Sequence, residues 1–241
     1  MRPIEERRRA AIVSFSGIDG AGKSTQIAAL CMRMKEEGLR VLVVTFWDDV
    51  ATLRKLREKS GKHLFKGDTG VGSPSRPILR RDKNVKSWIM TWIRLILYFL
   101  DAVSVRTAVR RALQSEADLV IFDRYTYDEL VNLTLGNRAI KIYARLVLSL
   151  VPKPDISYLL DADPISAFAR KPEYPLGFLY TNRQSYLDLS SLVGGMTVIP
   201  AMPVKDVEQA ILGHTRQQLV LKAPMAGNEW AQDRNAGPVK S

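Results

Sequence analysis

Apolar residues along the chain form short continuous runs that alternate with longer segments of helical spacing. The continuous runs cover residues 11–16, 40–46, 119–122, 156–160 and 196–199. They are rich in Val, Ile and Leu, as parallel strands covered on both faces are. Helical segments lie between them, at about residues 23–37, 85–115, 139–151, 178–192 and 204–219. The alternation predicts an α/β fold, a three-layer sandwich around a parallel five-stranded sheet.

The length and composition fit one domain built from these elements. Of the 241 residues, 46% are apolar, which is enough for a sizeable core. We predict that the domain covers residues 11–221 and follows a basic N-terminal extension over residues 1–10. A basic segment rich in Gly, Ser and Pro, residues 55–86, predicts a mobile loop, and residues 222–241 lack apolar periodicity and predict a disordered tail.

The charge and the cysteine content limit the partners and the location. The formal net charge of +11 indicates an anionic partner, for which a nucleotide, a nucleic acid and an acidic membrane surface all qualify. The basic residues are not interleaved with stacking aromatics, which disfavours a nucleic acid. The single cysteine, Cys31, cannot form an internal disulfide, and the N-terminus lacks the apolar segment of a secretory signal. These features favour a cytoplasmic location.

One apolar segment, residues 88–105, is long enough to raise the question of a membrane span. It contains Arg94 and Asp101. Each charge would cost about 2.5–3.5 kcal/mol near the centre of a bilayer. We therefore predict no transmembrane segment, and expect this stretch to be a buried helix of the domain.

The segment after the first predicted strand has the pattern of a phosphate-binding loop, or P-loop. Residues 17–24 read GIDGAGKS and match G-x-x-x-x-G-K-[ST] between a strand and a helix. Backbone N–H groups and the helix N-terminus bind phosphate oxygens in such a loop. Lys23 is expected to reach the β- and γ-phosphates of ATP, and Ser24 to bind Mg²⁺. The predicted nucleotide-binding residues are Gly17, Asp19, Gly20, Ala21, Gly22, Lys23, Ser24 and Thr25.

A buried strand that ends in a carboxylate provides a second candidate for the metal site. Residues 119–123 read LVIFD, so Asp123 stands where a Walker B aspartate is presented to a metal ion. An acid that caps a turn is the alternative. Arg124 follows directly, and its guanidinium is suited to gripping a second phosphate, with a surface ion pair as the alternative.

In these and further blocks of residues, the chain resembles the thymidylate kinase family of P-loop nucleoside monophosphate kinases. The matching blocks are FSGIDGAGKSTQ at 15–26, DRY at 123–125, KPD at 153–155, LDADP at 160–164 and RQSYL at 183–187. They cover most of the span from 11 to about 210. The resemblance implies Mg²⁺-dependent transfer of the γ-phosphoryl group of ATP to a nucleoside monophosphate, a mobile lid, and a homodimer in many members.

The resemblance also implies roles for single residues. It implies that Asp19 contacts the sugar hydroxyl of the acceptor, that Asp123 lies near magnesium, and that Arg124 binds the acceptor phosphate. One block of the family is missing: a Phe-Pro-x-Arg sequence usually follows the second strand, whereas Phe46 is followed here by WDD at residues 47–49. The acceptor arginine of that block is therefore absent, and acids stand in its place.

A basic lid residue is expected to complete the set of catalytic cations. Gly20 stands where some family members have a P-loop arginine, and members without it use basic residues of the lid, which is short here at residues 170–178. Arg170 is the candidate for closing over the transferred phosphoryl group. A solvated arginine at a helix end is the alternative.

Polar residues form a stripe on the otherwise apolar helix predicted over residues 85–115. They are Ser87, Thr91, Arg94, Tyr98 and Asp101, at spacings of four and three. Such a stripe is expected to face water, either bulk solvent or a substrate cleft. In a cleft, Arg94 would replace the missing acceptor arginine, Tyr98 would stack on a ring, and Asp101 would accept hydrogen bonds.

Three functions remain open from the sequence. The first is a nucleoside monophosphate kinase of the thymidylate type. The second is a related kinase with another acceptor, which WDD at residues 47–49 favours; an alcohol acceptor would make Asp19 or Asp123 the candidate base. The third is an ATP-binding module with little catalysis, in which the basic loop and the tail serve as docking surfaces.

Overall fold

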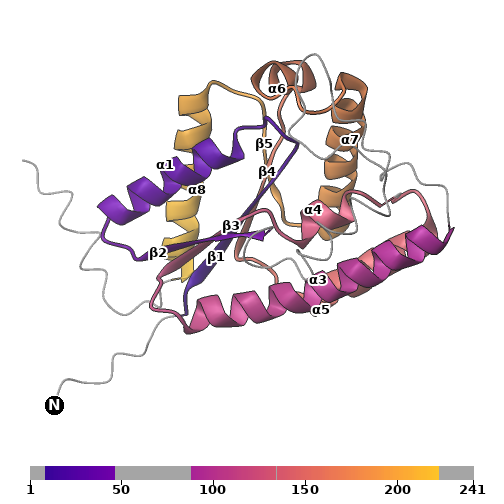
Figure 1. Cartoon of the computed structure of the whole chain (residues 1–241). Helices are drawn as coiled ribbons and strands as arrows, with labels where there is room; N and C mark the ends of the chain where they lie inside the picture. Colours follow the sequence, from indigo (N-terminus) through magenta and orange to yellow (C-terminus); the bar gives the residue numbers. More distant parts are fainter. Residues whose placement is uncertain (1–8, 47–87, 134, 223–241) are drawn as a thin grey trace, which may run out of the picture.

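The computed structural model describes residues 9–46, 88–133 and 135–222. Within them, five parallel strands form one sheet in the order β2-β3-β1-β4-β5 (Figure 1). The strands are β1 (Ala11–Ser16), β2 (Val41–Thr45), β3 (Leu119–Asp123), β4 (Ile156–Leu160) and β5 (Thr197–Ile199). The predicted α/β class with a parallel five-stranded sheet is thereby confirmed. The WDD residues 47–49, the predicted loop 55–86 and the predicted tail beyond Lys222 lie outside the described residues.

The central strand β1 explains why the apolar runs are continuous. It pairs with β3 on one side and β4 on the other, so that Val13 is in register with both Ile121 and Ile156. All six residues of β1 are buried. Successive side chains point to opposite faces of a sheet, and Ile12 and Val13 accordingly belong to two different core clusters.

Helices cover both faces of the sheet. They are α1 (Lys23–Glu36), α3 (Trp88–Gln114), α4 (Thr126–Leu130), α5 (Arg138–Leu150), α6 (Pro164–Arg170), α7 (Leu176–Val193) and α8 (Val204–Lys222). Buried residues of α1 and α8 pack in the core on one face, and those of α3, α5 and α7 pack in the core on the other. Figure 1 shows α1 beside α8, and α3 running alongside α5. The layers are therefore helix, sheet and helix, as predicted.

Two short helices, α4 and α6, were missed by the periodicity of apolar residues. Both are too short to show a clear helical period. The start of α6 nevertheless has a local signal, because Asp163 accepts a hydrogen bond from the backbone N–H of Ser166 at 2.9 Å and Pro164 takes the first helical position. Helix α4 begins at Thr126, and its first turn is closed by Asp128, whose carboxylate accepts a hydrogen bond from the backbone N–H of Tyr125 at 3.1 Å.

The long apolar helix α3 packs against the rest of the domain. Its buried side chains include Ala102, Val105 and Val109, which belong to the core cluster shared with α5 and the sheet. In the described part of the chain, no helix is both long and apolar enough to cross a membrane. The prediction of a buried helix over residues 88–105 therefore holds for one side of α3, whereas Ile96, Phe99, Leu100 and Val103 are exposed.

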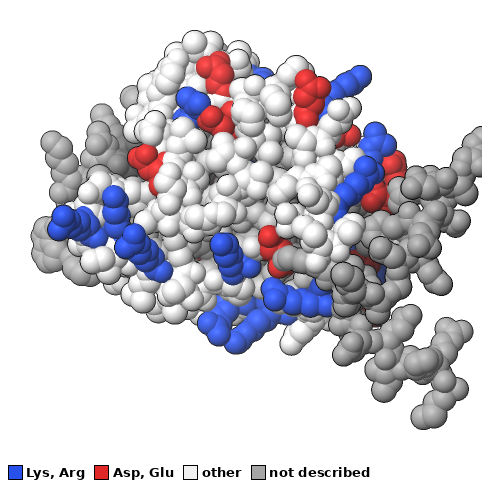
Figure 2. All heavy atoms as spheres, turned by 180° about the vertical axis from the view of Figure 1, so that it is seen from behind, with Lys and Arg blue, Asp and Glu red and all other residues white. Residues whose placement is uncertain are grey.

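The residues next to both predicted domain boundaries are described. Ala10 is 3% exposed and packs in the core, and Lys222 is the last residue of α8. The predicted domain range of residues 11–221 stays a prediction. Part of the positive charge of the chain is visible on its surface. Lys and Arg side chains lie along the lower edge of the molecule in Figure 2, and Figure 1 shows α3 and α5 at that edge.

Candidate active site

The predicted residues of the P-loop, together with Asp123, Arg124 and Arg170, gather at the carboxyl ends of β1, β3 and β4. Strand β1 leads through residues 17–22 into α1, and β3 leads through Arg124 into α4. Ligands of open parallel sheets bind at this edge, outside the carboxyl ends of the strands. The fold therefore brings the P-loop and the Asp-Arg-Tyr block together, although they lie about a hundred residues apart.

The P-loop backbone depends on its glycines at two positions. Gly17 and Gly20 have φ values of 144° and 81°, which side-chain-bearing residues rarely adopt. A Cβ atom at Gly17 would lie 2.7 Å from the carbonyl oxygen of Leu160, and one at Gly20 would lie 2.3 Å from that of Ala167. The loop is thus packed directly against β4 and α6. An arginine in place of Gly20 would not fit this backbone.

Lys23 lies folded over the P-loop. Its side chain is buried, and Nζ donates hydrogen bonds to the carbonyl oxygens of Gly17 at 2.8 Å and Ile18 at 2.9 Å. Burial lowers the pKa of Lys23 to about 8. The charge of Arg124 also lowers this pKa, whereas three nearby acids raise it. An ammonium group with two carbonyl partners has one hydrogen left, which is available to a phosphate oxygen.

This pKa predicts that nucleotide binding takes up a proton at alkaline pH. In the protein without nucleotide the pKa of Lys23 is about 8, so its ammonium is fully charged well below that pH. Phosphates bound beside it would raise this pKa. Affinity for ATP should therefore be highest below pH 8 and fall by up to about tenfold per pH unit above it. Calorimetry at about pH 9 in two buffers of different ionisation enthalpy should detect uptake of nearly one proton. Equal heats in the two buffers would contradict the assignment.

Ser24 and Asp123 are placed where a metal ion could bind. Both line one cavity of about 480 Å³ beside α1 and β2. Burial raises the pKa of Asp123, against the opposing charges of Lys23 and Arg124, and a bound cation would favour its ionised form. Among the described residues, no cluster of three or more His, Cys, Asp or Glu side chains could hold a metal ion. A hydroxyl, one carboxylate and phosphate oxygens are a set that suits Mg²⁺.

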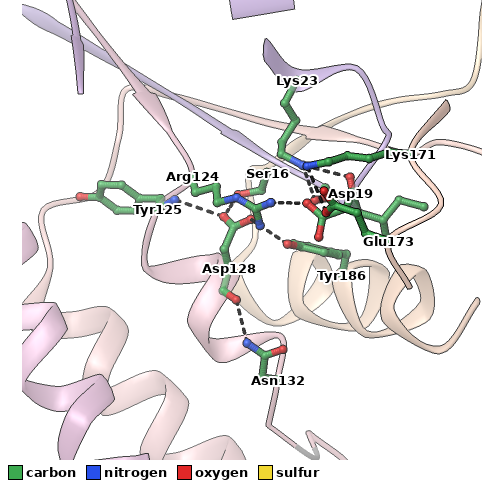
Figure 3. Close-up of polar contacts among 12 residues, drawn as sticks. Ser16, Asp19, Lys23, Arg124, Tyr125, Asp128, Asn132, Lys171, Glu173 and Tyr186 are labelled. Carbon is green, nitrogen blue, oxygen red and sulfur yellow. Dashed lines mark hydrogen bonds and ion pairs between the residues drawn. The ribbon is translucent and has the colours of Figure 1, made fainter. Parts of the chain in front are cut away.

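Arg124 connects the two halves of the site. Its Nη2 pairs with Asp19 Oδ1, its Nη1 lies 3.5 Å from Asp128 Oδ1, and its backbone N–H donates to the carbonyl oxygen of Phe15 at 3.0 Å (Figure 3). Burial alone would lower the pKa of Arg124, but the nearby acids raise it above its usual value. The guanidinium is therefore a fixed, permanently charged group between the P-loop and α4.

Asp19 is held in its ionised form at the P-loop. Burial acts to raise its pKa, but Arg124, Lys23 and Lys171 together lower it below the usual value. The Asp19 side chain is 17% exposed, so another molecule can reach it. A charged, accessible carboxylate beside two cations can accept hydrogen bonds from a hydroxyl group.

Asp128 is the residue of this site that sequence reasoning missed. It is 3% exposed, and its carboxylate accepts hydrogen bonds from Ser16 Oγ at 2.7 Å, Tyr186 Oη at 2.7 Å and the backbone N–H of Tyr125 at 3.1 Å (Figure 3). The only local signal was an acid in the first turn of α4. Its side-chain partners come from β1 and α7, so no single short motif contains Asp128 together with them.

The lid candidate Arg170 lies at the P-loop. It is the last residue of α6, and its Nε donates a hydrogen bond to the carbonyl oxygen of Gly20 at 2.8 Å. The predicted lid, residues 170–178, runs from this helix end into α7, which begins at Leu176. Arg170 also lines a cavity of about 380 Å³ together with Gly22, Thr25 and residues 199–204. This cavity lies beside the P-loop and can hold a ring attached to a bound phosphate chain.

The polar stripe of α3 does not have the predicted exposure. Tyr98 is 7% and Asp101 1% exposed, so the expectation that these two side chains face water is wrong. Helix α5 covers this side of α3. Burial raises the pKa of Tyr143 on α5 to about 12, and the nearby charge of Asp101 adds to this effect. The side chain of Arg94 lies outside the described residues, as do Ser87 and the side chain of Thr91. A role of Arg94, Tyr98 and Asp101 in acceptor binding stays a prediction.

The chain is similar to several proteins that are named thymidylate kinase. One from Chlorobium luteolum is 30% identical over 200 residues, which cover 74% of this chain and 83% of that protein. One from Caldanaerobacter subterraneus is 31% identical over 169 residues, 68% of this chain and 69% of that protein. A probable thymidylate kinase from Archaeoglobus fulgidus is 24% identical over 208 residues, 83% of this chain and 92% of that protein.

A family model also matches the N-terminal part of the chain. It is described as methylmalonyl Co-A mutase-associated GTPase MeaB and covers residues 2–71. This range contains the P-loop but is less than a third of the 241 residues, and it ends before β3, Arg124 and Asp128. The similarity to the kinases, in contrast, extends over most of the chain.

Proposed function

Because this chain belongs to the thymidylate kinase family, we propose that it transfers the γ-phosphoryl group of ATP to a nucleoside monophosphate, with thymidylate as the first acceptor to be tested. The observation that carries the proposal is the position of Arg124. Its guanidinium pairs with Asp19 of the P-loop, so a second cation stands next to the loop that would hold the donor phosphates. A phosphate acceptor needs such a cation close to the transferred group.

The donor side of the proposal assigns the P-loop to a triphosphate. Backbone N–H groups of residues 17–25 and the ammonium of Lys23 would bind the phosphates, and the cavity beside Arg170 would hold the base. Mg²⁺ bound by Ser24 and Asp123 would neutralise phosphate charge and keep the β- and γ-phosphates in place. The partial match to a GTPase model makes GTP the donor to compare with ATP.

The acceptor side assigns Arg124 to the acceptor phosphate and Asp19 to its sugar hydroxyl. The acceptor oxygen already carries negative charge when the acceptor is a phosphate, so no general base is required. Catalysis then consists of holding the two phosphates in line and neutralising the charge that develops between them. Lys23, Arg124 and Arg170 are the cations that this chain supplies for that purpose.

A second candidate function is a P-loop kinase with an acceptor other than thymidylate. The observation that favours it is the sequence WDD at residues 47–49, which replaces the expected acceptor arginine with acids. With an alcohol acceptor, Asp19 or Asp123 would be the candidate base, since both carboxylates are partly exposed. An ATP-binding module with little catalysis is the third candidate.

A coupled assay of ADP release separates these functions. The purified full chain is tested with Mg²⁺ and ATP, or GTP, against deoxynucleoside monophosphates, ribonucleoside monophosphates, nucleosides and phosphosugars. We expect turnover with a nucleoside monophosphate, at a kcat of about 1–100 per second. Turnover with nucleosides or phosphosugars alone would move the function to the second candidate. Nucleotide binding without any turnover would move it to the third.

A further inference from the structure

We propose that Asp128 and Tyr186 form a positioning pair, which holds the guanidinium of Arg124 in the orientation that grips the acceptor phosphate. The inference rests on the proposed function for the role of Arg124, but the arrangement itself is a property of the folded chain. Neither residue is expected to touch the acceptor, because Asp128 is 3% and Tyr186 is 3% exposed.

Both oxygens of the Asp128 carboxylate are committed to groups of the protein. Oδ2 accepts from Ser16 Oγ at 2.7 Å and from the backbone N–H of Tyr125 at 3.1 Å. Oδ1 accepts from Tyr186 Oη at 2.7 Å and lies 3.5 Å from Nη1 of Arg124. A buried carboxylate with this many donors cannot rotate without losing several bonds together. Asp128 is therefore a rigid anchor.

The same carboxylate fixes the backbone next to Arg124. Arg124 has a φ of 71°, the left-handed conformation that residues other than glycine adopt only when their surroundings enforce it. The backbone N–H of the next residue, Tyr125, donates to Asp128, and the N–H of Arg124 itself donates to the carbonyl oxygen of Phe15. Both the backbone and the side chain of Arg124 are thus held by fixed groups of the protein.

The two acidic partners of Arg124 differ in accessibility. The Asp128 side chain is fully buried, whereas the side chain of Asp19 is 17% and that of Arg124 is 21% exposed. A phosphate that enters from solvent can therefore share or take over the Nη2 side of the guanidinium, which faces Asp19. It cannot reach the buried oxygens of Asp128. Arg124 accordingly has one permanent anchor and one partner that an acceptor can replace.

Tyr186 connects this anchor to α7. Its hydroxyl reaches Asp128 from the helix that follows the predicted lid, residues 170–178, so the anchor ties together β1, α4 and α7. Burial and the adjacent Asp128 raise the pKa of Tyr186 well above its usual value, so its hydroxyl stays protonated and donates. Replacing this tyrosine with phenylalanine would remove one hydrogen-bond donor while keeping the ring that fills the space.

The kinetic test uses Asp128→Asn and Tyr186→Phe. We expect Asp128→Asn to raise the acceptor KM by about tenfold to a hundredfold, since a small misplacement of a positioning group has effects of that size. Tyr186→Phe should raise it by about threefold to tenfold, with a smaller risk of misfolding. Asp128 is also one of the acids that raise the pKa of Lys23, so the assay is run well below pH 8, where Lys23 stays charged and the KM for ATP should change less than twofold in both. An unchanged acceptor KM in a folded Asp128→Asn protein would overturn the proposal, as would an equal loss for donor and acceptor.

A matched control is available at the opposite end of β3. Asp118 lies before the first residue of β3, whereas Arg124 follows its last residue, and it accepts hydrogen bonds of 3.0 Å from both Nε and Nη2 of Arg40. Asp118→Asn removes an arginine–aspartate pair of the same chemistry but should leave both KM values unchanged. A rise of its acceptor KM as large as that of Asp128→Asn would mean that the effect is not specific to Arg124.

A second measurement does not depend on turnover. In the ligand-free protein, exchange of the Arg124 Nε–H with water, followed by ¹⁵N NMR, should be at least about tenfold faster in Asp128→Asn than in the parent and unchanged in Asp118→Asn. Equal exchange rates would overturn the anchoring. If instead the exchange responds as expected while no nucleoside monophosphate is phosphorylated, the proposed function fails and the anchoring stands.

Discussion

Replacing Lys23 with methionine is expected to lower kcat/KM for phosphoryl transfer by about a thousandfold. Methionine keeps the length of the side chain and loses the ammonium group. That group is buried over the P-loop and bonded to the carbonyl oxygens of Gly17 and Ile18, so it stands beside the expected path of the phosphates. The charge that develops on the transferred group would then lack its nearest fixed cation. Single-turnover kinetics and binding of Mg·ATP measure the loss.

The stability of the same variant separates loss of function from loss of fold. Lys23 is 7% exposed, and burial of its charge is unfavourable, as its lowered pKa indicates. Methionine should therefore keep the melting temperature or raise it. Lys141→Met removes the same charge from an exposed position on α5 and should change neither activity nor stability. Full activity of Lys23→Met would contradict the assignment of the P-loop as the donor site.

Replacing Arg124 with lysine is expected to raise the acceptor KM by about a hundredfold. Lysine keeps the positive charge but cannot pair with Asp19 and Asp128 through two separate nitrogens, as Nη2 and Nη1 do here. A compact ammonium must choose one partner, and the acceptor phosphate then loses the planar group that binds it. Steady-state kinetics with the acceptor identified by the ADP assay measure the change.

The donor side of the reaction supplies the internal control for Arg124→Lys. The KM for ATP should change by less than about threefold, because the P-loop contacts of Lys23 are made without the Arg124 side chain. Arg40→Lys, which alters the ion pair with Asp118 at the other end of the sheet, should leave both KM values unchanged. If Arg124→Lys raised the ATP KM and left the acceptor KM unaffected, Arg124 would belong to the donor site.

The sequence predicted most elements correctly because their signals are local. Each strand appears as a run of Val, Ile and Leu that both faces of the sheet require, as in residues 156–160, and α1 appears as a helical repeat that ends before Gly38. The P-loop is likewise a contiguous pattern, whose glycines at 17, 20 and 22 carry the positive φ angles. The short helices α4 and α6 were missed because fewer than two helical turns carry little periodicity.

The polar stripe of α3 shows that residue spacing alone does not predict whether a helix face is exposed. Tyr98 and Asp101 lie at the spacing of an exposed polar face, yet both are buried. Helix α5 lies against α3 there, with the hydroxyl of Tyr143 donating to the carbonyl oxygen of Leu95 at 2.5 Å. The spacing of residues tells which side chains share one face of a helix. It does not tell which other element covers that face.

Sequence alone determined the fold class, because each strand and long helix has its own pattern of apolar residues. It also determined the P-loop and the candidate residues Lys23, Asp123 and Arg124, because each of them belongs to a contiguous motif. Tertiary structure decided the strand order and the surroundings of Arg124. Asp128 is 112 residues from Ser16 and 58 from Tyr186, and only the folding of β1, α4 and α7 onto one another brings their side chains together. Hydrogen bonds act over about 3 Å, so a site made from distant segments leaves no pattern along the chain.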